Sequence, residues 1–386
     1  MRSRRIYRLA LAGLLLASCD RELAGPASAA APEIVSVAVA PGPHNVLSLI
    51  VTTRVQDADS VAIRFRSANA SVDEDILTLS IAVRADSAVI PVLGLEAEQT
   101  YLLRALAWGP GGTADGSVLQ AMTGALPSDL PAYAAGGPDP SPGYVVFAAG
   151  RYGLVTDNTG RVVWYRRFPN GPGLNFMAQP TGHYAVRPPT PEPGDVEPWL
   201  ELDALGNITR TMDLTAFGGH AAARVTGTVV QQVGANGALL FEWSPFDHFA
   251  ITDLDPAERT GVHVNWTHGN SLDIDGDGQL LVSFRSLGEI TRIDRATGER
   301  YVIDGNAMTA RLVASNGAGQ GFVTTIGGSV QDLPGGRTLA AFGTAGRVVE
   351  YDADGLVVWS FTGNVGYVFR AQRIASLYAP GTGSAR

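Results

Sequence analysis

The strongest chemical signal in the sequence is a histidine and an arginine that one predicted hairpin would bring together. The segment 265–272 reads NWTHGNSL, and LVSFR follows it after a turn rich in Asp and Gly. If Gly276 and Asp277 form a two-residue loop, the ladder places His268 opposite Arg285. A guanidinium binds the oxygens of tetrahedral oxyanions, and an imidazole can donate to them or act as acid or base. The pair therefore predicts an anion site, with a structural histidine and a solvated arginine as the alternative.

Repeated hairpins supply the elements that would position this pair. Five segments share, with variation, the pattern apolar-x-Asp-x-x-Gly-x-apolar-apolar-Trp: 154–165, 200–210, 229–243, 290–303 and 348–361. A second, inner type precedes three of them, at 176–186, 272–285 and 330–343. Regular alternation of inner and outer hairpins predicts a β-propeller. Inner hairpins are missing before the Gly237 turn and after the Gly298 turn, so we expect about six blades, two of them short of strands.

The region before these repeats has a different pattern. Short strands with period-two alternation occupy 33–126, which predicts a β-sandwich. Its segment GLEAEQTY (94–101) resembles the corner before a late strand in fibronectin type III domains. The predicted fold is therefore all-β, with a fibronectin III-like sandwich at 33–126, a linker rich in Pro, Gly and Ala at 127–142 and the propeller at 143–380.

The start of the chain predicts export and lipid attachment. Four arginines precede an apolar run at 9–17, which is too short to span a bilayer as a helix and is typical of a secretory signal. The run ends Leu-Ala-Ser-Cys, which resembles a bacterial lipoprotein box with Cys19 as the lipidated residue; an ordinary signal with an incidental cysteine is the alternative. We expect a signal at 1–19, a tether at 20–32, and a lipid-anchored protein in the bacterial cell envelope that faces the periplasm.

Composition excludes several classes of function. The 386 residues carry 28 basic and 37 acidic side chains, a formal charge of -9, which argues against nucleic acid as a partner and leaves the lipid anchor as the expected membrane attachment. There is no lysine, so a P-loop lysine, a Schiff-base lysine and a Ser-Lys dyad are excluded. The single cysteine excludes internal disulfides and Cys-based zinc clusters. We expect no metal and no diffusible cofactor.

The turn of the central hairpin invites a second interpretation. The sequence DIDGDG (273–278) begins like a calcium-binding loop, but position 12 of that loop would be Phe284 in place of the bidentate Glu. A plain β-turn is therefore favoured. The serines near this hairpin lack any G-x-S-x-G context, so the sequence gives no support to a serine hydrolase.

Four segments in consistent order resemble the bacterial arylsulfotransferase family. They are FEWS with the following Asp-His (241–248), WTHGNS (266–271), SFR (283–285) and FRAQRIASLY (369–378), and the likeness covers about 140–380. The resemblance implies a six-bladed propeller that moves a sulfuryl group from an aryl sulfate to a phenol through a transient sulfohistidine. His268 and Arg285 match two family positions that hold the sulfuryl oxygens.

The sequence departs from this family at the nucleophile. The family's nucleophilic histidine lies in a Gln-His segment, and no Gln-His pair occurs in this chain. His220 and His263 are the histidines that could replace it, and together with Asn270 they are the expected substrate contacts. Two functions stay open. One is a sulfotransferase for small aryl sulfates and phenols; the other is a propeller without turnover that acts as a binding or scaffold protein.

Overall fold

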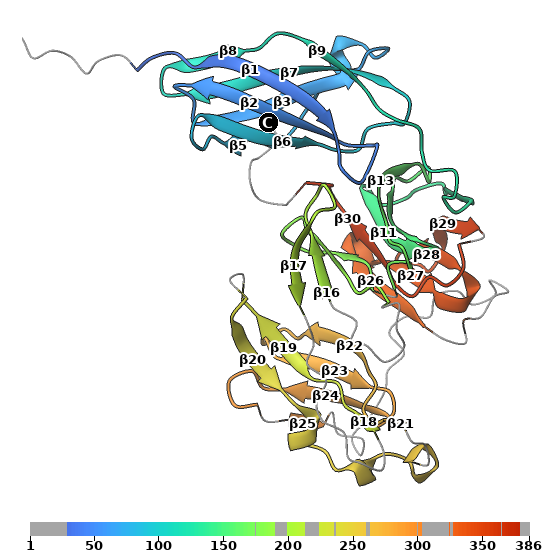
Figure 1. Ribbon diagram of the computed structural model, residues 1–386. Coiled ribbons are helices and arrows are strands. Elements are labelled where there is room, and N and C mark those ends of the chain that lie inside the picture. The colour runs from blue at the N-terminus through green and yellow to red at the C-terminus, as the bar shows by residue number, and fades with distance from the viewer. Residues whose placement is uncertain are drawn as a thin grey trace, which may run out of the picture. The chain divides into compact units, whose positions relative to one another are not determined.

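The chain is built from β-strands, as the sequence predicts. The computed structural model describes residues 29–173, 175–189, 199–212, 224–234, 237–259, 263–298, 300–302, 324, 327–363 and 365–378. Within these ranges the regular structure consists of strands and short 3-10 turns, with no α-helix and hence no helix that could cross a membrane. Contacts divide the chain into an N-terminal unit, Met1–Pro127 with Tyr378–Arg386, and a C-terminal unit, Ser128–Leu377 (Figure 1).

Two antiparallel sheets form the N-terminal unit. One has the order β1–β2–β6; the other has the order β4–β3–β7–β8, with β5 also on β3 and β9 also on β7. The strands are β1 Glu33–Pro41, β2 Leu49–Gln56, β3 Ser60–Ser67, β4 Ile76–Leu77, β5 Ile81–Ala82, β6 Ser87–Val92, β7 Thr100–Gly109, β8 Gly112–Asp115 and β9 Leu119–Met122. Alternation along β3 places Val61, Ile63 and Phe65 in the core, while Arg64 and Arg66 lie outside it.

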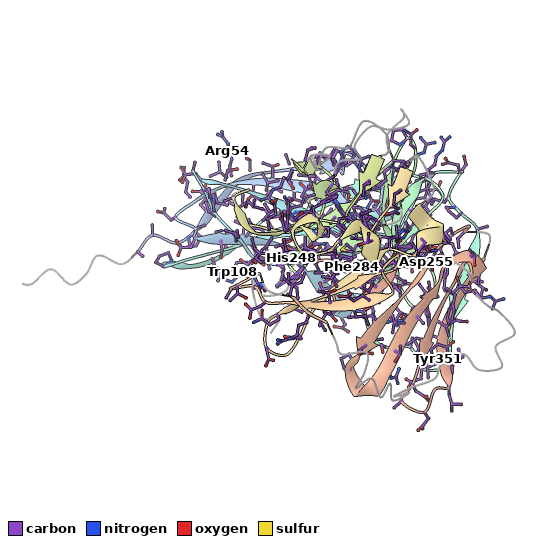
Figure 2. The ribbon with its side chains drawn as sticks, turned by 90° about the horizontal axis from the view of Figure 1, so that it is seen from below. Arg54, Trp108, His248, Asp255, Phe284 and Tyr351 are labelled. Atoms are coloured by element: carbon purple, nitrogen blue, oxygen red, sulfur yellow. The ribbon has the colours of Figure 1, made fainter. Side chains whose placement is uncertain are left out.

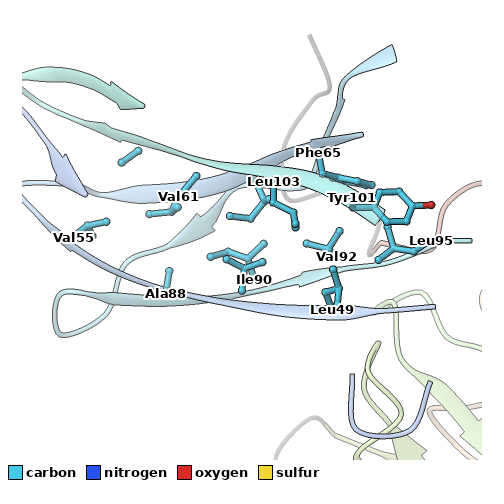
Figure 3. Packing of buried hydrophobic residues seen from close by; sticks show 14 residues of the cluster. Leu49, Val55, Val61, Phe65, Ala88, Ile90, Val92, Leu95, Tyr101 and Leu103 are labelled. Atoms are coloured by element: carbon cyan, nitrogen blue, oxygen red, sulfur yellow. The ribbon is translucent and has the colours of Figure 1, made fainter. Parts of the chain in front are cut away.

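An apolar core lies between these two sheets. Val55 and Ile90 from the three-stranded sheet belong to the same buried cluster as Val61 and Leu103 from the other sheet (Figure 3). At one end of the cluster the Tyr101 hydroxyl accepts a hydrogen bond from the Glu96 backbone N–H at 2.8 Å. A tyrosine bonded to backbone a few residues upstream is the tyrosine corner of sandwich domains. The contact fixes how the chain enters β7.

The C-terminal unit consists largely of antiparallel hairpins. We number its sheets by the order of their hairpins in the chain. Sheet I is β13–β12–β11–β30, sheet II is β14–β15–β16–β17, sheet III is β19–β20, sheet IV is β22–β23–β24–β25 and sheet V is β10–β29–β28–β27–β26. The strands are β10 Tyr133–Gly136, β11 Tyr144–Ala149, β12 Tyr152–Thr156, β13 Val162–Arg167, β14 Met177–Ala178, β15 Tyr184–Val186, β16 Trp199–Leu202, β17 Ile208–Met212, β18 Arg224–Thr226, β19 Val230–Val233, β20 Leu239–Trp243, β21 His263–Asn265, β22 Gly269–Ile274, β23 Leu280–Phe284, β24 Glu289–Ile293, β25 Arg300–Val302, β26 Gly328–Leu333, β27 Arg337–Phe342, β28 Arg347–Tyr351, β29 Val357–Gly363 and β30 Ala371–Ile374. β18 and β21 form a separate parallel pair.

The predicted hairpins are present. Inner and outer hairpins follow one another as β14–β15 and β16–β17, β22–β23 and β24–β25, and β26–β27 and β28–β29. Sheet III has two strands among the described residues, and the first expected gap, before the Gly237 turn, falls mostly in 213–223, outside the described residues. The second expected gap, after the Gly298 turn, falls mostly in 303–323, outside the described residues.

One turn geometry recurs in these hairpins. The Oδ1 atoms of Asp157, Asp203, Asp275 and Asp352 each accept hydrogen bonds from the N–H groups two and four residues later, at 2.8–3.1 Å. The glycine three residues after each aspartate has a φ between +80° and +84°. Glycine adopts this left-handed conformation without steric cost. The Asp-x-x-Gly pattern therefore determines where the chain reverses.

This geometry accounts for the calcium-like sequence. Besides the turn amides, Asp275 accepts a hydrogen bond from Arg292 at 2.6 Å, and Asp277 accepts another from Arg292 at 2.9 Å. The Arg292 bond, with the backbone bond from Gln279, holds the pKa of Asp275 below its usual value. The interpretation as a β-turn is confirmed, because these carboxylates bind turn amides and a guanidinium.

Strands from the start of the C-terminal unit pair with strands from its end, an arrangement that we call strand exchange. β10 adds to β29, with Tyr133 opposite Gly363, and β30 adds to β11, with Tyr144 opposite Ile374. The segment 127–142, predicted as a linker from its Pro, Gly and Ala content, therefore contributes an edge strand to sheet V. The Tyr133 ring packs 4.6 Å from the ring of Phe361, which explains why a strand of small residues is retained there.

Side chains of one sheet bind the turn of the next. Three tryptophans donate their indole N–H to a backbone carbonyl in a turn of another sheet: Trp359 to Asn158 at 2.9 Å, Trp164 to Ala204 at 2.8 Å and Trp243 to Gly298 at 3.1 Å. Arg210 donates to Gly234 O at 3.4 Å between sheets II and III. These bonds connect the sheets in the series V, I, II, III, IV.

A buried ion pair reinforces the contact between sheets V and I. Glu350 of β28 has no exposed surface, and Arg373 of β30 is 7% exposed. Arg373 donates to Glu350 Oε2 at 2.5 Å, and its guanidinium lies 5.3 Å from the centre of the Trp359 ring. The other carboxylate oxygen accepts from the Ser141 N–H at 2.9 Å and from Arg337 at 3.3 Å. Burial lowers the pKa of Arg373, and Glu350 opposes that shift.

Candidate functional site

His268 and Arg285 lie opposite each other at one end of the β22–β23 hairpin. The Arg285 N–H donates to the His268 carbonyl at 3.0 Å, and the neighbouring residues Gly269 and Phe284 are register partners. The predicted juxtaposition of these two positions is therefore confirmed at the level of the backbone.

The predicted two-residue loop is wrong, although its consequence holds. The Asp275 N–H donates to Gln279 O at 2.9 Å, so three residues form the loop and Gly278 has the positive φ. The longer loop shifts the register of the strands by one residue. A bulge at Asn270, between Gly269 and Ser271, shifts it back. The two deviations cancel, and His268 remains opposite Arg285.

The residues on either side of His268 are fixed by one threonine. The Thr228 N–H donates to Thr267 Oγ1 at 2.7 Å, and the Gly269 N–H donates to Thr228 Oγ1 at 2.8 Å. A Cβ at Gly269 would lie 2.6 Å from Thr228 Cγ2, so only glycine fits. Between these two anchors His268 adopts a φ of +45°, which non-glycine residues rarely do. The Thr-His-Gly sequence thus holds the imidazole at a defined place.

A hydrogen bond also sets the tautomer of the neutral imidazole. Asn265 Nδ2 lies 2.8 Å from His268 Nδ1. An amide nitrogen can only donate, so Nδ1 accepts and the ring proton resides on Nε2. His268 is half-buried, and Arg285 is exposed and makes no side-chain hydrogen bond within the described ranges. The hairpin end therefore offers an imidazole N–H and a guanidinium with unused donors.

The hairpin rests on an aromatic cluster. Trp266 is 2% exposed and packs 4.9 Å from the Phe246 ring, and Phe284 is fully buried 5.9 Å from the Trp243 ring. His248 stacks on Trp243 at 4.7 Å with the planes 6° apart, which gives it a packing role; His248 and Phe284 are labelled in Figure 2. The large buried rings hold the ends of both strands in place.

The other predicted site residues are placed less fully. Asn270 is exposed at the bulge, and its side chain makes no hydrogen bond among the described residues. His263 begins β21, whose backbone pairs in parallel with β18. His220 and Cys19 lie outside the described residues. Within the ranges described, no group of three or more His, Cys, Asp or Glu residues could hold a metal ion.

Sequence reasoning missed two residues that hold His268. Asn265 was inside the motif but was not assigned a role, although its spacing of three residues could have suggested a local contact. Thr228 lies 40 residues earlier in the chain, in a segment without a recognisable pattern. Its role follows from the parallel pairing of β18 with β21, which the hairpin repeat did not predict.

Comparisons with known proteins do not identify the function of this chain. No family model and no curated protein matches the sequence. Similar solved structures include virginiamycin B lyase from Staphylococcus aureus, 11% identical, covering 73% of this chain and 94% of that chain with a TM-score of 0.29. Another is an auxiliary nutrient binding protein from Bacteroides ovatus, 13% identical, covering 86% of this chain and 85% of that chain with a TM-score of 0.25. Likeness at this level assigns neither fold nor function.

Proposed function

We propose that this protein binds aryl sulfates at the end of the β22–β23 hairpin, as an arylsulfotransferase-like protein of the bacterial cell envelope. One observation carries the proposal: His268, with its proton on Nε2, lies opposite Arg285, whose guanidinium has no partner among the described residues. The four sequence segments that resemble arylsulfotransferases include both residues.

The proposal includes a finer description of the fold. We assign sheets I to V to a six-bladed propeller, supported by the sheet-to-turn hydrogen bonds and by the strand exchange between the two chain ends of the unit. We assign the N-terminal unit to a fibronectin III-like sandwich. Its support is the tyrosine corner at Tyr101 and the three-stranded sheet packed against a larger one.

The chemistry of a sulfate ester fits these donors. Its three peripheral oxygens share the negative charge, and Arg285 can donate two parallel N–H groups to them. The His268 Nε2–H can donate to the remaining oxygen. Charge-assisted hydrogen bonds of this kind are about twice as strong as neutral ones. The pair is suited to hold the sulfuryl group of the ligand, while the aryl group extends away from the hairpin.

Binding without efficient turnover is the expected outcome. Transfer through a sulfohistidine requires a nitrogen that attacks sulfur while the S–O bond to the departing phenol breaks. The chain has no Gln-His segment to supply that nitrogen. His268 and Arg285 can stabilise charge on the sulfuryl oxygens, but they do not replace an in-line nucleophile.

The test uses purified full-length protein, 4-nitrophenyl sulfate and excess phenol. We expect calorimetry to detect weak binding that Arg285→Ala and His268→Ala each reduce by roughly tenfold or more, and nitrophenolate release to stay near background. Arg151→Ala is the matched control, because Arg151 is an exposed arginine of the same unit. Equal binding by Arg285→Ala and wild type would contradict the proposed site.

Robust release of nitrophenolate would instead favour a working sulfotransferase. The nucleophile is then identified by substitution and mass spectrometry. Loss of release in His220→Ala or His263→Ala, with a sulfo adduct on that residue in the wild type, would show that another histidine has taken the role.

A further inference from the structure

An arginine pair on the outer face of the N-terminal unit breaks a rule of sheet stability. Arg64 of β3 and Arg104 of β7 are direct register partners, and Arg66 follows two residues along β3 on the same face. Like charges directly opposite each other in neighbouring strands are destabilising. A sheet that retains such a pair is expected to gain something from it other than stability.

The arginines surround a pocket that the strand pairing creates. On the side away from β3, strand β7 pairs with β8 at Leu106–Gly109 and with β9 at Thr100–Leu103, so no strand pairs with β7 on that side at Arg104. The pocket at this gap has a volume of about 250 Å³, and its lining includes Arg64, Arg66 and Arg104. The pocket therefore lies beside the interruption between β8 and β9, and residues of β3, β7 and the segment 72–75 line it.

Among the residues that line this pocket, three arginines stand against one aspartate, Asp75. Asp75 pairs with Arg66 at 3.0 Å, and Asp115 lies 3.5 Å from Arg104. Arg64 is exposed and makes no side-chain hydrogen bond or ion pair to the described residues. The Nε atom of Arg66 is buried and also lacks a hydrogen-bond partner there. Three guanidinium groups thus face two carboxylates, and donors remain unused.

The rest of the lining is apolar. Val72, Leu102 and Val118 border the same pocket, and Val72 is 66% and Val118 48% exposed. An engineered cavity of about 150 Å³ is enough to hold benzene. A pocket of this size can therefore accept a small apolar group next to the arginines.

We infer that this pocket binds an oxyanion carried on a small apolar body, such as an organic phosphate, sulfate or carboxylate. The oxyanion accepts hydrogen bonds from Arg64 and Arg104, and the apolar body contacts Val72, Leu102 and Val118. The attraction between the arginines and the anion offsets the repulsion between the two arginines. The site is independent of the His268–Arg285 hairpin.

Titration calorimetry on the full-length chain tests this inference. Every protein in this experiment carries Arg285→Ala, so that the hairpin site does not contribute to binding. The probes are phenyl phosphate and inorganic phosphate. We expect phenyl phosphate to bind more tightly than inorganic phosphate, and Arg64→Gln and Arg104→Gln each to weaken binding by roughly tenfold or more. Arg54→Gln is the control, an exposed arginine on β2 of the other sheet, labelled in Figure 2.

Thermal unfolding separates a binding role from a structural one. Because Arg64→Gln removes a like-charge contact, its Tm should be equal to or above that of the parent chain. Weaker binding with undiminished Tm supports the inference. The inference is overturned if Arg64→Gln and Arg104→Gln bind phenyl phosphate with the same affinity as the control Arg54→Gln. Equal affinity for phenyl phosphate and inorganic phosphate overturns the assignment of an apolar contact.

Vesicles distinguish the two sources of such an anion. Phosphatidylglycerol vesicles present the same phosphate chemistry at a membrane surface, and co-flotation measures binding of the non-lipidated chain. Co-flotation that Arg64→Gln abolishes would support the site with a lipid headgroup as its source. Phenyl phosphate binding without co-flotation would support the site with a free small molecule as its source.

Discussion

Glu350 is a fully buried carboxylate whose oxygens are all used by partners from distant parts of the chain. Ser141 precedes it by 209 residues, and Arg373 follows it by 23. Removing one member of such a pair costs more than the pair itself contributes, because it leaves an uncompensated charge inside the protein. The residue therefore offers a direct test of how sheets V and I are held together.

Glu350→Gln should destabilise the C-terminal unit by about 3–5 kcal/mol, since Arg373 would lose its counter-charge while it stays buried. Urea unfolding followed by tryptophan fluorescence measures the change. Glu242→Gln provides the comparison, because Glu242 is an exposed strand glutamate of the same unit, and its cost should stay below about 1 kcal/mol. Similar costs for both substitutions would refute the role of the buried pair.

Two buried tryptophans differ in whether the indole N–H bonds to a turn of the neighbouring sheet. Trp164 and Trp266 are both buried, with 0% and 2% exposure. The Trp164 indole donates to Ala204 O at 2.8 Å, whereas the Trp266 Nε1 atom is buried without a partner among the described residues. The two residues thus share size and burial but differ in hydrogen bonding.

Trp164→Phe should cost more stability than Trp266→Phe, by roughly 1–3 kcal/mol. Both substitutions remove ring volume. Only Trp164→Phe leaves a buried carbonyl without its donor, whereas Trp266→Phe removes a buried indole N–H that has no partner among the described residues. Chemical denaturation of the two variants beside the wild type gives the difference. An equal or larger loss for Trp266→Phe would mean that packing, and not the indole hydrogen bond, determines the contact.

The hairpins were predictable from sequence because their signals are local. Each Asp-x-x-Gly turn holds its aspartate within four residues of the amides that it binds, so the pattern specifies the reversal directly. The strand β10 was not predictable, because Tyr-Ala-Ala-Gly has little strand character and depends on Phe361 for its packing. The same contrast applies to the site: hairpin spacing predicted His268 opposite Arg285, and the pairing holds because the bulge at Asn270 compensates for the longer loop. The Thr228 contact was not predictable, because it depends on a parallel pair whose strands are 39 residues apart.

The whole protein is proposed to be attached to a membrane through Cys19. Cys19 is the only cysteine in the chain, so thiol-linked lipid has no other place to attach. Metabolic labelling of bacteria that express the full-length protein with a palmitate analogue should label the wild type and leave Cys19→Ala at background. Equal label in the two proteins would mean that the start of the chain is an ordinary secretory signal.

The strand exchange in the C-terminal unit also sets an order of events on the ribosome. Tyr133 and Gly363, and likewise Tyr144 and Ile374, are register partners 230 residues apart. At about 5–20 residues per second, β10 and β11 emerge roughly 10–50 s before the strands that complete their sheets. During that interval the apolar sequence of β11, Tyr-Val-Val-Phe-Ala-Ala, lacks β30 at its open edge. The nascent chain must therefore be protected from aggregation until its last strand has been synthesised.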